Sequence, residues 1–311
     1  MKRGFSACLL ALGMGWTATL AAQPAQCPAQ GVALQLLGSG GPISDDARAS
    51  SGALLWIDGK ARALIDAGGG TYLRYGQSGA RLEDLDFIGI SHFHTDHVSD
   101  LPALLKGAYF LSGEHALTLA GPSGNADFPS MKAFYDALFA RPKGAFRYLA
   151  GLSDGSEGLG LNVRVTDVDV AAMQGQPVFE GKDFQVYALG IPHGDVPTLA
   201  FRIVTPQAVA VVSADQNGSR PAFVDFARGA DLLVMPAAIT EDADDTSRFL
   251  HAKPSVVGDI AASVQPSKLV LNHFMGRALY DKEETLAEVT RRFPGTTVAG
   301  RDLACFILSQ P

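Results

Sequence analysis

The segment from His92 to His97, with the sequence HFHTDH, places three histidines and one aspartate within six positions. It follows the apolar run from Leu85 to Ile90, which predicts a buried strand, and precedes residues 98–109, whose apolar spacing predicts a helix. Open α/β sheets usually bind ligands beyond the carboxyl ends of their strands. We therefore expect these four side chains to lie on a turn at such an end.

The spacing of these four side chains favours metal binding. His92 and His94 are two positions apart, so in an extended segment both imidazoles point the same way and can share one ion. Asp96 and His97 are adjacent, cannot follow that direction, and could serve a second ion beside the first. An exposed polar loop would explain one or two of these residues, but not three imidazoles and a carboxylate after a buried strand.

The sequence from His92 to His97 also matches the HxHxDH signature of metallo-β-lactamase-fold hydrolases, and the chain resembles this family from about Val32 to Leu308. The resemblance implies an α/β (α+β) fold, the four-layer αβ/βα metallo-β-lactamase sandwich. In it, two mixed β-sheets lie face to face with helices outside. The site is expected at the edge where the strand-end loops meet.

Three later residues occupy the family's remaining ligand positions. His193 lies in a turn before an apolar strand, Asp215 ends another strand, and His273 ends a third. The usual pattern has Gly before this Asp and Thr after it, whereas this chain has Ala214 and Gln216. The resemblance implies a first metal site of His92, His94 and His193, a second of Asp96, His97 and His273, and a bridging Asp215.

Four further residues receive roles with alternatives. Asp96 is expected to orient the nucleophile as well as bind metal. His251 falls where ribonuclease Z-like and arylsulfatase-like members carry an extra histidine. It could donate a proton to the leaving oxygen, steady a non-bridging oxygen, or be a structural turn residue. Asp66 could orient a ligand histidine or only form a turn. Arg277 could pair with an anionic substrate, although an exposed role is favoured.

Imidazole and carboxylate ligands suit two divalent ions, zinc first, with manganese or iron also compatible. The resemblance implies a hydrolase with a metal-bridging hydroxide that attacks a small phosphodiester, aryl sulfate or related ester. A lactonase or β-lactam hydrolase is the second hydrolytic hypothesis. A one-iron oxidoreductase of the persulfide dioxygenase type is a different class. The complete seven-ligand set argues against a non-catalytic metal-binding protein.

The first residues predict export. Lys2-Arg3, an apolar run from about Phe5 to Leu20, and the small residues Ala21-Ala22 form the pattern of a secretory signal peptide. A membrane anchor is the competing interpretation, but the run is short and interrupted by glycines, so no stable anchor is expected. We expect a signal peptide at residues 1–22, one domain at residues 23–311, and a periplasmic or secreted product.

Net charge bears on the substrate and partners. The formal charge is −7, and loss of Lys2 and Arg3 with the signal would remove two positive charges and give −9. An acidic surface repels polyphosphate backbones, so no nucleic acid is expected and a small-molecule ester is preferred. A homodimer is left open. In an oxidising compartment Cys27 and Cys305 either join the N-terminal segment to the last strand or remain buried thiols.

Two other patterns predict local structure. The apolar runs 53–57 and 61–65 are separated by Asp58-Gly59-Lys60, which predicts a hairpin. Residues 131–139 predict a helix with aromatic side chains on one face, either packed on the core or forming a wall of an apolar substrate pocket. The Gly- and Ser-rich residues 152–161 predict a loop.

Overall fold

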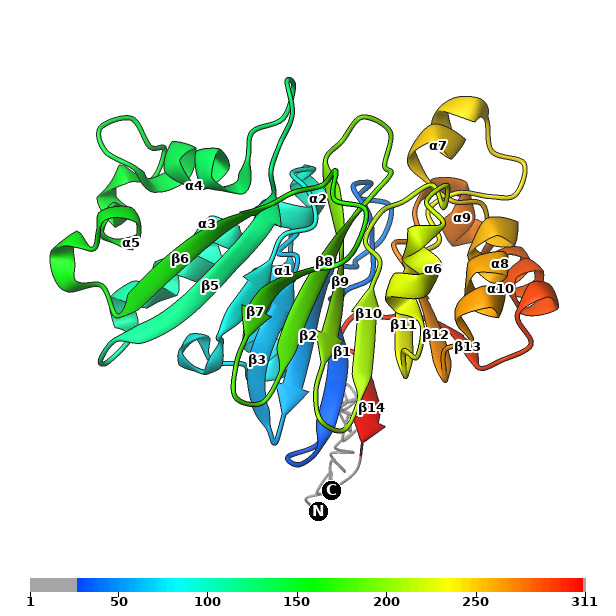
Figure 1. Cartoon of the computed structure of the whole chain (residues 1–311), viewed down its shortest axis with the longest axis horizontal. Coiled ribbons are helices and arrows are strands. Elements are labelled where there is room, and N and C mark those ends of the chain that lie inside the picture. The colour runs from blue at the N-terminus through cyan, green and yellow to red at the C-terminus, as the bar shows by residue number, and fades with distance from the viewer. Residues whose placement is uncertain (1–26, 310–311) are drawn as a thin grey trace, which may run out of the picture.

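The structure is a computed structural model that describes residues 27–309. It contains two seven-stranded mixed β-sheets packed face to face, with helices on the outer faces (Figure 1). The signal peptide expected at residues 1–22 lies outside the described residues. The first sheet has the order β14-β1-β2-β3-β4-β5-β6, with β1 (Val32–Gly38), β2 (Gly52–Ile57), β3 (Lys60–Ile65), β4 (Phe87–Gly89), β5 (His115–Pro122), β6 (Leu161–Val168) and β14 (Cys305–Ser309).

The second sheet repeats the plan of the first. In each sheet, four neighbouring strands pair antiparallel, and the fourth also begins a parallel series with three further strands. The order of the second sheet is β13-β12-β11-β10-β9-β8-β7, with β7 (Gln176–Glu180), β8 (Gln185–Ile191), β9 (Thr198–Val204), β10 (Val209–Val212), β11 (Leu232–Pro236), β12 (Lys268–Asn272) and β13 (Thr297–Ala299). The repetition brings strand ends from both sheets to one edge of the sandwich.

Helices connect the parallel strands and cover the outer faces, as expected for parallel pairs, which need crossover connections. They are α1 (Thr71–Ser78), α2 (Thr95–Val98), α3 (Leu101–Leu105), α4 (Met131–Phe139), α5 (Gly151–Asp154), α6 (Ala222–Ala227), α7 (Asp245–Leu250), α8 (Pro254–Val264), α9 (Gly276–Tyr280) and α10 (Lys282–Arg292). Short 3-10 helices are η1 (Leu82–Asp84), η2 (Lys106–Phe110), η3 (Arg147–Leu149) and η4 (Ser156–Gly158).

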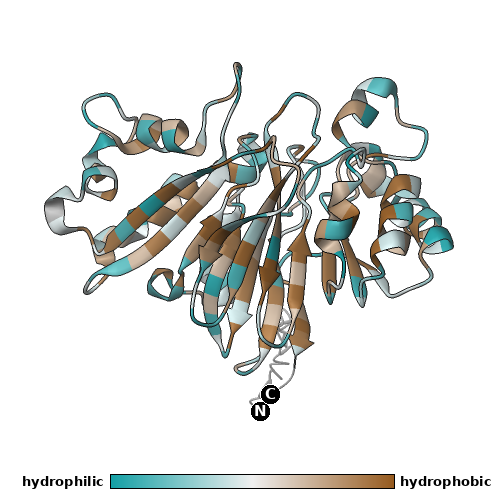
Figure 2. Cartoon of the chain, viewed as in Figure 1, coloured by the Kyte–Doolittle hydropathy of each residue, from teal (hydrophilic) through white to brown (hydrophobic). Residues whose placement is uncertain are grey.

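Three apolar clusters hold the four layers together. The central cluster lies between the sheets and includes Leu34, Leu55, Phe201 and Val234. The other two lie between each sheet and its helices. Figure 2 shows the resulting hydrophobic bands along the strands. Since burial of apolar surface is the main favourable term in folding, these three clusters stabilise the sandwich from which the edge loops extend. The predicted four-layer fold is confirmed.

The predicted hairpin between β2 and β3 is confirmed. Its turn residues Asp58 and Gly59 have φ of 48° and 74°. Positive φ at both central positions is the requirement of a type I′ turn, which Asp-Gly meets well. The strand predicted at 85–90 forms as the shorter β4, and the helix predicted at 131–139 forms as α4.

Two predicted segments differ from the structure. The helix expected over residues 98–109 is divided into α2, α3 and η2, and α2 begins already at Thr95, so that it includes the predicted ligands Asp96 and His97. Pro102 then occupies the first turn of α3, where its missing N–H costs nothing. The loop expected over residues 152–161 contains most of α5 and η4, which Gly155 separates with a φ of 69°.

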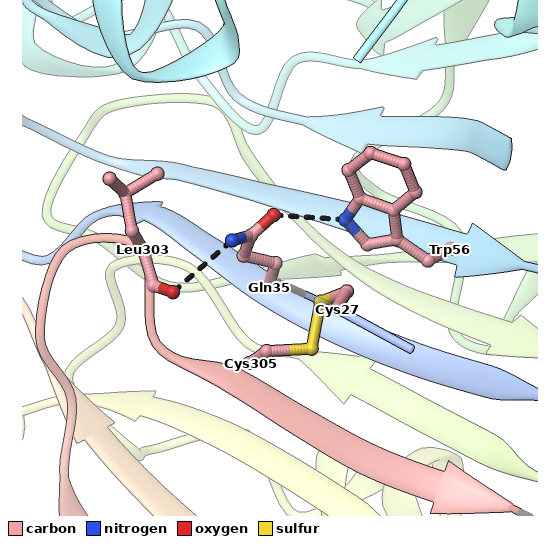
Figure 3. Close-up of a disulfide and its surroundings, with 5 residues drawn as sticks. All are labelled: Cys27, Gln35, Trp56, Leu303 and Cys305. Atoms are coloured by element: carbon pink, nitrogen blue, oxygen red, sulfur yellow. Dashed lines mark hydrogen bonds between the residues drawn. A yellow bond between two sulfur atoms is a disulfide. The ribbon is translucent and has the colours of Figure 1, made fainter. Parts of the chain in front are cut away.

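A disulfide joins Cys27 to Cys305 across 278 residues of sequence (Figure 3). Beside it, the Gln35 side chain bridges two segments by donating to the carbonyl oxygen of Leu303 and accepting from the indole of Trp56. Of the two arrangements open from sequence, the structure has the disulfide. Between residues 27 and 309, none of the helices is long and apolar enough to cross a membrane.

Candidate metal centre

Five strand ends and one helix end supply the side chains of one buried cluster. The segments that follow β3, β4, β8, β10 and β12 carry, in order, Asp66, the HxHxDH residues, His193, Asp215 and His273, and His251 caps the end of α7. All of the predicted ligands except His94 are buried, and His94 is half-buried. The structure therefore brings together all seven predicted ligands, with His94 on the open side.

His92, His94 and His193 form the first group, with one ligand atom from each lying within 4.8 Å of the others. His94 Nδ1 and His193 Nε2 are 3.4 Å apart. His92 Nε2 is buried and has no hydrogen-bond partner within residues 27–309. A buried polar atom without a partner is costly unless a ligand binds it, so this nitrogen indicates a ligand at the centre of the group.

Asp96, His97, Asp215 and His273 form the second group. His273 Nε2 lies 3.1 Å from Asp96 Oδ2, 3.3 Å from His97 Nε2 and 3.3 Å from Asp215 Oδ2. Asp215 Oδ2 is also 3.8 Å from His193 Nε2 in the first group. Asp215 is thus the carboxylate that both groups share, as the resemblance implies.

These separations fit metal coordination. A tetrahedral zinc ion with ligand atoms about 2.0–2.1 Å away has ligand–ligand separations of roughly 3.3–3.4 Å. Four separations between ligand atoms, one in the first group and three in the second, run from 3.1 to 3.5 Å and lie close to that value. The donor set of imidazoles and carboxylates also suits zinc and related divalent ions. The buried residues therefore fit metal ions.

Two hydrogen bonds set which ring nitrogen faces the centre. Nδ1 of His97 lies 2.8 Å from Asp66 Oδ2, and Nδ1 of His193 lies 2.8 Å from the carbonyl oxygen of Leu250. Because both partners are acceptors, each Nδ1 carries a proton, and Nε2 is the nitrogen that faces the cluster and is available to a metal once it carries no proton itself. Of the two roles open for Asp66, the structure supports orientation of a ligand histidine.

Left-handed backbone shapes three of the strand ends. Asp66, Ala214 and His273 have φ of 63°, 53° and 56°. Residues other than glycine seldom adopt this conformation, which persists where the surroundings enforce it and clusters at functional sites. The backbone of Gly68 also lies very close to that of Asp96, since a Cβ on Gly68 would be 1.9 Å from the carbonyl oxygen of Asp96. The Asp-Ala-Gly segment after β3 is thus packed directly beneath the ligand turn.

Charge in the second group favours cations. Burial alone would lower the pKa of His97, but the carboxylates of Asp215 and Asp66 raise it well above the usual value. Burial would likewise raise the pKa of Asp215, but His273 and His97 hold it well below the usual value. The carboxylates therefore stay ionised and attract protons or metal ions to the same space. Metal binding would displace the imidazole protons.

The first group behaves differently because it has fewer carboxylates. Burial lowers the pKa values of His92, His94 and His193. These imidazoles are neutral at pH 7, which is the form that binds metal.

His251 lies beside both groups. Its ring centroid is 5.0 Å from that of His193 and 5.8 Å from that of His273, and its Nδ1 is 4.0 Å from Asp215 Oδ2. That Nδ1 is buried and unpaired among the described residues, and burial lowers the pKa of His251 to about 4. The ring could join His193 and Asp215 around an ion or face a bound substrate.

Several neighbours of the cluster could not be identified from sequence. Ser91 Oγ lies 3.0 Å from His92 Nδ1, and the backbone of Gly41 lies against His273, because a Cβ there would be 2.8 Å from the ring.

Two other residues lie outside the cluster. Arg277 is exposed and pairs with Asp242 at 3.1 Å, which agrees with the exposed role favoured from sequence. His115 lies away from the cluster, near the carbonyl oxygen of Ser112.

Comparison with known proteins agrees with this geometry. Residues 61–274 match the Beta-lactamase superfamily domain. The chain belongs to the beta-lactamase superfamily. It is 25% identical over 316 residues to a ribonuclease Z from Bradyrhizobium sp. (strain ORS 278), covering 86% of this chain and 96% of that protein. These matches confirm the expected class of enzyme, a metal-dependent hydrolase acting on ester bonds.

Solved structures of superfamily proteins have the same fold. The metallo-beta-lactamase fold protein YhfI from Bacillus subtilis has a TM-score of 0.68 and 20% identity, with 88% of this chain and 98% of that chain covered. The short form of human tRNase Z also has a TM-score of 0.68 and 20% identity, covering 89% of this chain and 100% of that chain.

The expectation that no nucleic acid takes part is contradicted by these relatives. Proteins named ribonuclease Z align with 86% of the chain and with nearly their own full length. The expectation relied on the formal net charge of −7. Net charge describes the whole surface, whereas divalent ions dominate the local field where a phosphate would bind. The net charge of the whole chain therefore does not predict whether a nucleic acid binds at the metal centre.

Proposed function

We propose that this chain is an exported, binuclear metal-dependent phosphodiesterase that hydrolyses phosphodiester bonds, including those of RNA. The observation that carries the proposal is the shared carboxylate of Asp215, which lies within 3.8 Å of both His193 Nε2 and His273 Nε2. The ribonuclease names of relatives that align along most of the chain support the choice of bond. Small phosphodiesters offer the same reacting group and belong to the same proposal.

The two ions would be held by the two groups, with His92, His94 and His193 around one and Asp96, His97 and His273 around the other. Asp215 would contact both. Zinc is proposed because the ligand atoms are nitrogen and oxygen and their separations match a tetrahedral ion. When bound, such ions activate water and neutralise charge that develops on a phosphoryl group. Buried, ionised carboxylates at the site keep it selective for cations.

The residues of this chain supply orientation and hydrogen bonds. Asp66 and the Leu250 carbonyl fix the tautomers of His97 and His193, so both ligand nitrogens are in place before substrate binds. Asp96 is proposed to orient the nucleophile, since its Oδ2 lies 3.1 Å from His273 Nε2 and 3.5 Å from His97 Nε2. His251 is neutral at pH 7 with its Nδ1 unpaired among the described residues. We assign it a hydrogen bond to a non-bridging phosphoryl oxygen.

Export is proposed from two observations. The first 22 residues have the pattern of a signal peptide, and the chain contains a disulfide between Cys27 and Cys305. Disulfides persist in oxidising compartments and are rare in the cytosol. Expression of the full chain in a Gram-negative host, followed by fractionation and mass measurement, tests this part. A periplasmic product that begins near Gln23 supports it, and an intact cytosolic chain contradicts it.

The activity is tested with the purified chain loaded with zinc. The substrates are a short RNA, bis(p-nitrophenyl) phosphate, p-nitrophenyl sulfate, a lactone and a β-lactam. We expect hydrolysis of the RNA and of the small phosphodiester, both reduced by about 10³-fold or more in Asp215→Ala because removal of the shared carboxylate disrupts both groups. Hydrolysis of the sulfate, lactone or β-lactam with no cleavage of either phosphodiester would contradict the proposal.

A further inference from the structure

A cavity of about 410 Å³ lies beside the metal centre. One wall is the loop that leaves β11 and enters α7, and the opposite wall is the segment from Met275 to Ala278 at the start of α9. Ile43, from the loop after β1, closes a third side. Figure 1 shows α7 and α9 near each other at the strand-end edge of the second sheet.

The two walls are the chain segments that carry residues of the metal centre. The loop and α7 lead directly to His251, and Met275 follows His273 by two positions. The backbone of Gly41 lies against the second wall, because a Cβ there would lie 2.8 Å from the His273 ring and 3.1 Å from the Met275 sulfur. One wall of the cavity therefore adjoins His273 of the second group, and the other wall belongs to the segment that leads to His251.

The volume of this cavity suits an organic group. The small cavity beneath the ligands, lined by His97 and His273 together with inter-sheet core residues such as Val234, measures only about 20 Å³ and has room for about one water molecule. Pockets that bind small organic ligands have volumes of about 300–1,000 Å³. The larger cavity, of about 410 Å³, falls within that range and can hold an organic substituent of a phosphodiester held at the ligands.

The chemistry of the walls indicates which group fits. The apolar surface comes from Ile43, Ile239 and Met275, whose thioether makes favourable contacts with aromatic rings. The rim carries Asp242 and Asp244 against one cation, Arg277, which is already paired with Asp242. The rim therefore has a net charge of −1 from two carboxylates and one guanidinium. Such a rim disfavours an anion and favours a flat apolar group with N–H donors.

We propose that this cavity binds the nucleobase next to the scissile phosphate and prefers bases that carry an exocyclic amino group. The assignment rests on the proposed phosphodiesterase function, since that function places a nucleotide at the ligands. Ile43 and Met275 would contact the faces of the base. Asp244 would accept from the amino group, as carboxylates do from the N4 amino group of cytosine. Uracil has no such donor and would bind less well.

Nucleoside binding tests the cavity without relying on catalysis. Cytidine and uridine are titrated separately into the zinc-loaded chain and followed by NMR. We expect cytidine to bind about fivefold more tightly than uridine, the difference of roughly one hydrogen bond. Ser247→Phe fills the cavity and should weaken cytidine binding at least tenfold, which is within the usual range for loss of base stacking. Thr246→Phe adds the same side chain to the exposed neighbour on α7 and serves as the matched control.

A second variant removes the charge of Asp244 and keeps its capping role in α7. Asp244 caps α7 by accepting from the Ser247 N–H, and Asn caps helices equally well. Asp244→Asn should therefore fold normally and reduce the preference for cytidine to within about twofold. Equal binding of the two nucleosides by the wild type, or equal loss of binding in Thr246→Phe and Ser247→Phe, would overturn the inference. Retained cytidine binding in both Phe variants would overturn it as well.

Failure of this inference and failure of the proposed function have different signatures. If zinc-loaded chain cleaves RNA but binds neither nucleoside, the cavity assignment fails alone. If it binds cytidine in the cavity but cleaves no phosphodiester, the proposed function fails and the binding site stands.

Discussion

The carboxylate of Asp66 lies 2.8 Å from Nδ1 of His97, and both side chains are almost completely buried. Asp66 also accepts from the backbone N–H and the hydroxyl of Ser91 at 2.7 and 2.9 Å. The end of β3 thus fixes both the tautomer of one ligand and the backbone from which the ligand turn departs. The Asp66 carboxylate therefore holds both the start of the HxHxDH turn and the orientation of one of its metal ligands.

Replacement of Asp66 should weaken one metal site. Asp66→Asn keeps the shape but loses the charged acceptor for His97, and outer-shell changes of this kind typically lower metal affinity by about 10–100-fold. We expect competition with a chelator to show loss of one zinc at lower chelator concentration than in the wild type. The control is Asp225→Asn, whose side chain is 82% exposed. Equal zinc affinity in Asp66→Asn and wild type would contradict the assigned role.

His251→Ala tests how this histidine acts. Burial lowers its pKa to about 4, so above that pH the imidazole is neutral and its charge does not change up to alkaline pH. Acting as a neutral hydrogen-bond donor, it should contribute about 10²-fold to kcat at every pH between roughly 5.5 and 9. The variant should therefore lower the pH–rate profile without changing its shape. His115→Ala, at a histidine away from the cluster, serves as the control.

A different pH–rate profile would contradict this role of His251. If His251 delivers a proton from its charged form, the wild-type rate falls on an alkaline limb that disappears in His251→Ala. That outcome would assign proton donation to the leaving oxygen instead.

Ala214 should be replaceable by Gly with a gain in stability. Its φ is 53°, where an L-residue costs about 1–2 kcal/mol, whereas Gly adopts this region freely. Gly also loses about 0.5–1 kcal/mol more conformational freedom on folding, so the net gain should be roughly 0.5–1 kcal/mol. Denaturant unfolding of metal-free protein measures it. Ala210→Gly, inside β10, should instead destabilise. A loss of stability in Ala214→Gly would show that its methyl group packs favourably.

The disulfide should contribute stability without serving the site. It closes a loop across 278 residues, and removal of such a bridge typically lowers the free energy of unfolding by about 2–4 kcal/mol. Urea unfolding of Cys305→Ser should show this loss, and a reductant should have the same effect on the wild type but none on the variant. Zinc content should be unchanged in both. If zinc is lost when the disulfide is removed, the disulfide also supports the metal centre, and the prediction is contradicted.

The ligand set could be predicted from sequence because its chemistry is local. Two-residue spacing in the HxHxDH segment puts His92 and His94 on one side of an extended strand end, and later ligands follow recognisable apolar strands. The fold could be predicted with them, since the motif order is specific to one family. Net charge was the misleading feature, because it averages over a surface that a substrate meets at one place.

Other features of the site depend on contacts between distant segments. The partner of His193 is the carbonyl oxygen of Leu250, which ends α7, a helix that the sequence pattern did not predict. A backbone acceptor has no residue signature. The left-handed conformation of His273 is enforced by its surroundings, including the Gly41 backbone against its ring, and a non-glycine residue gives no warning of it. The cavity between the β11–α7 loop and the start of α9 depends on contacts of the same kind, and the sequence did not predict it.

Metal content is the most direct test of the central claim, that seven converging side chains hold two divalent ions. The chain is purified without chelators, equilibrated with zinc, separated from free metal, and measured by mass spectrometry together with Asp215→Ala. We predict two zinc ions per wild-type chain and a loss of at least one in the variant. A single iron per chain, with oxygen consumption on a thiol substrate, would contradict the account and favour an oxidoreductase.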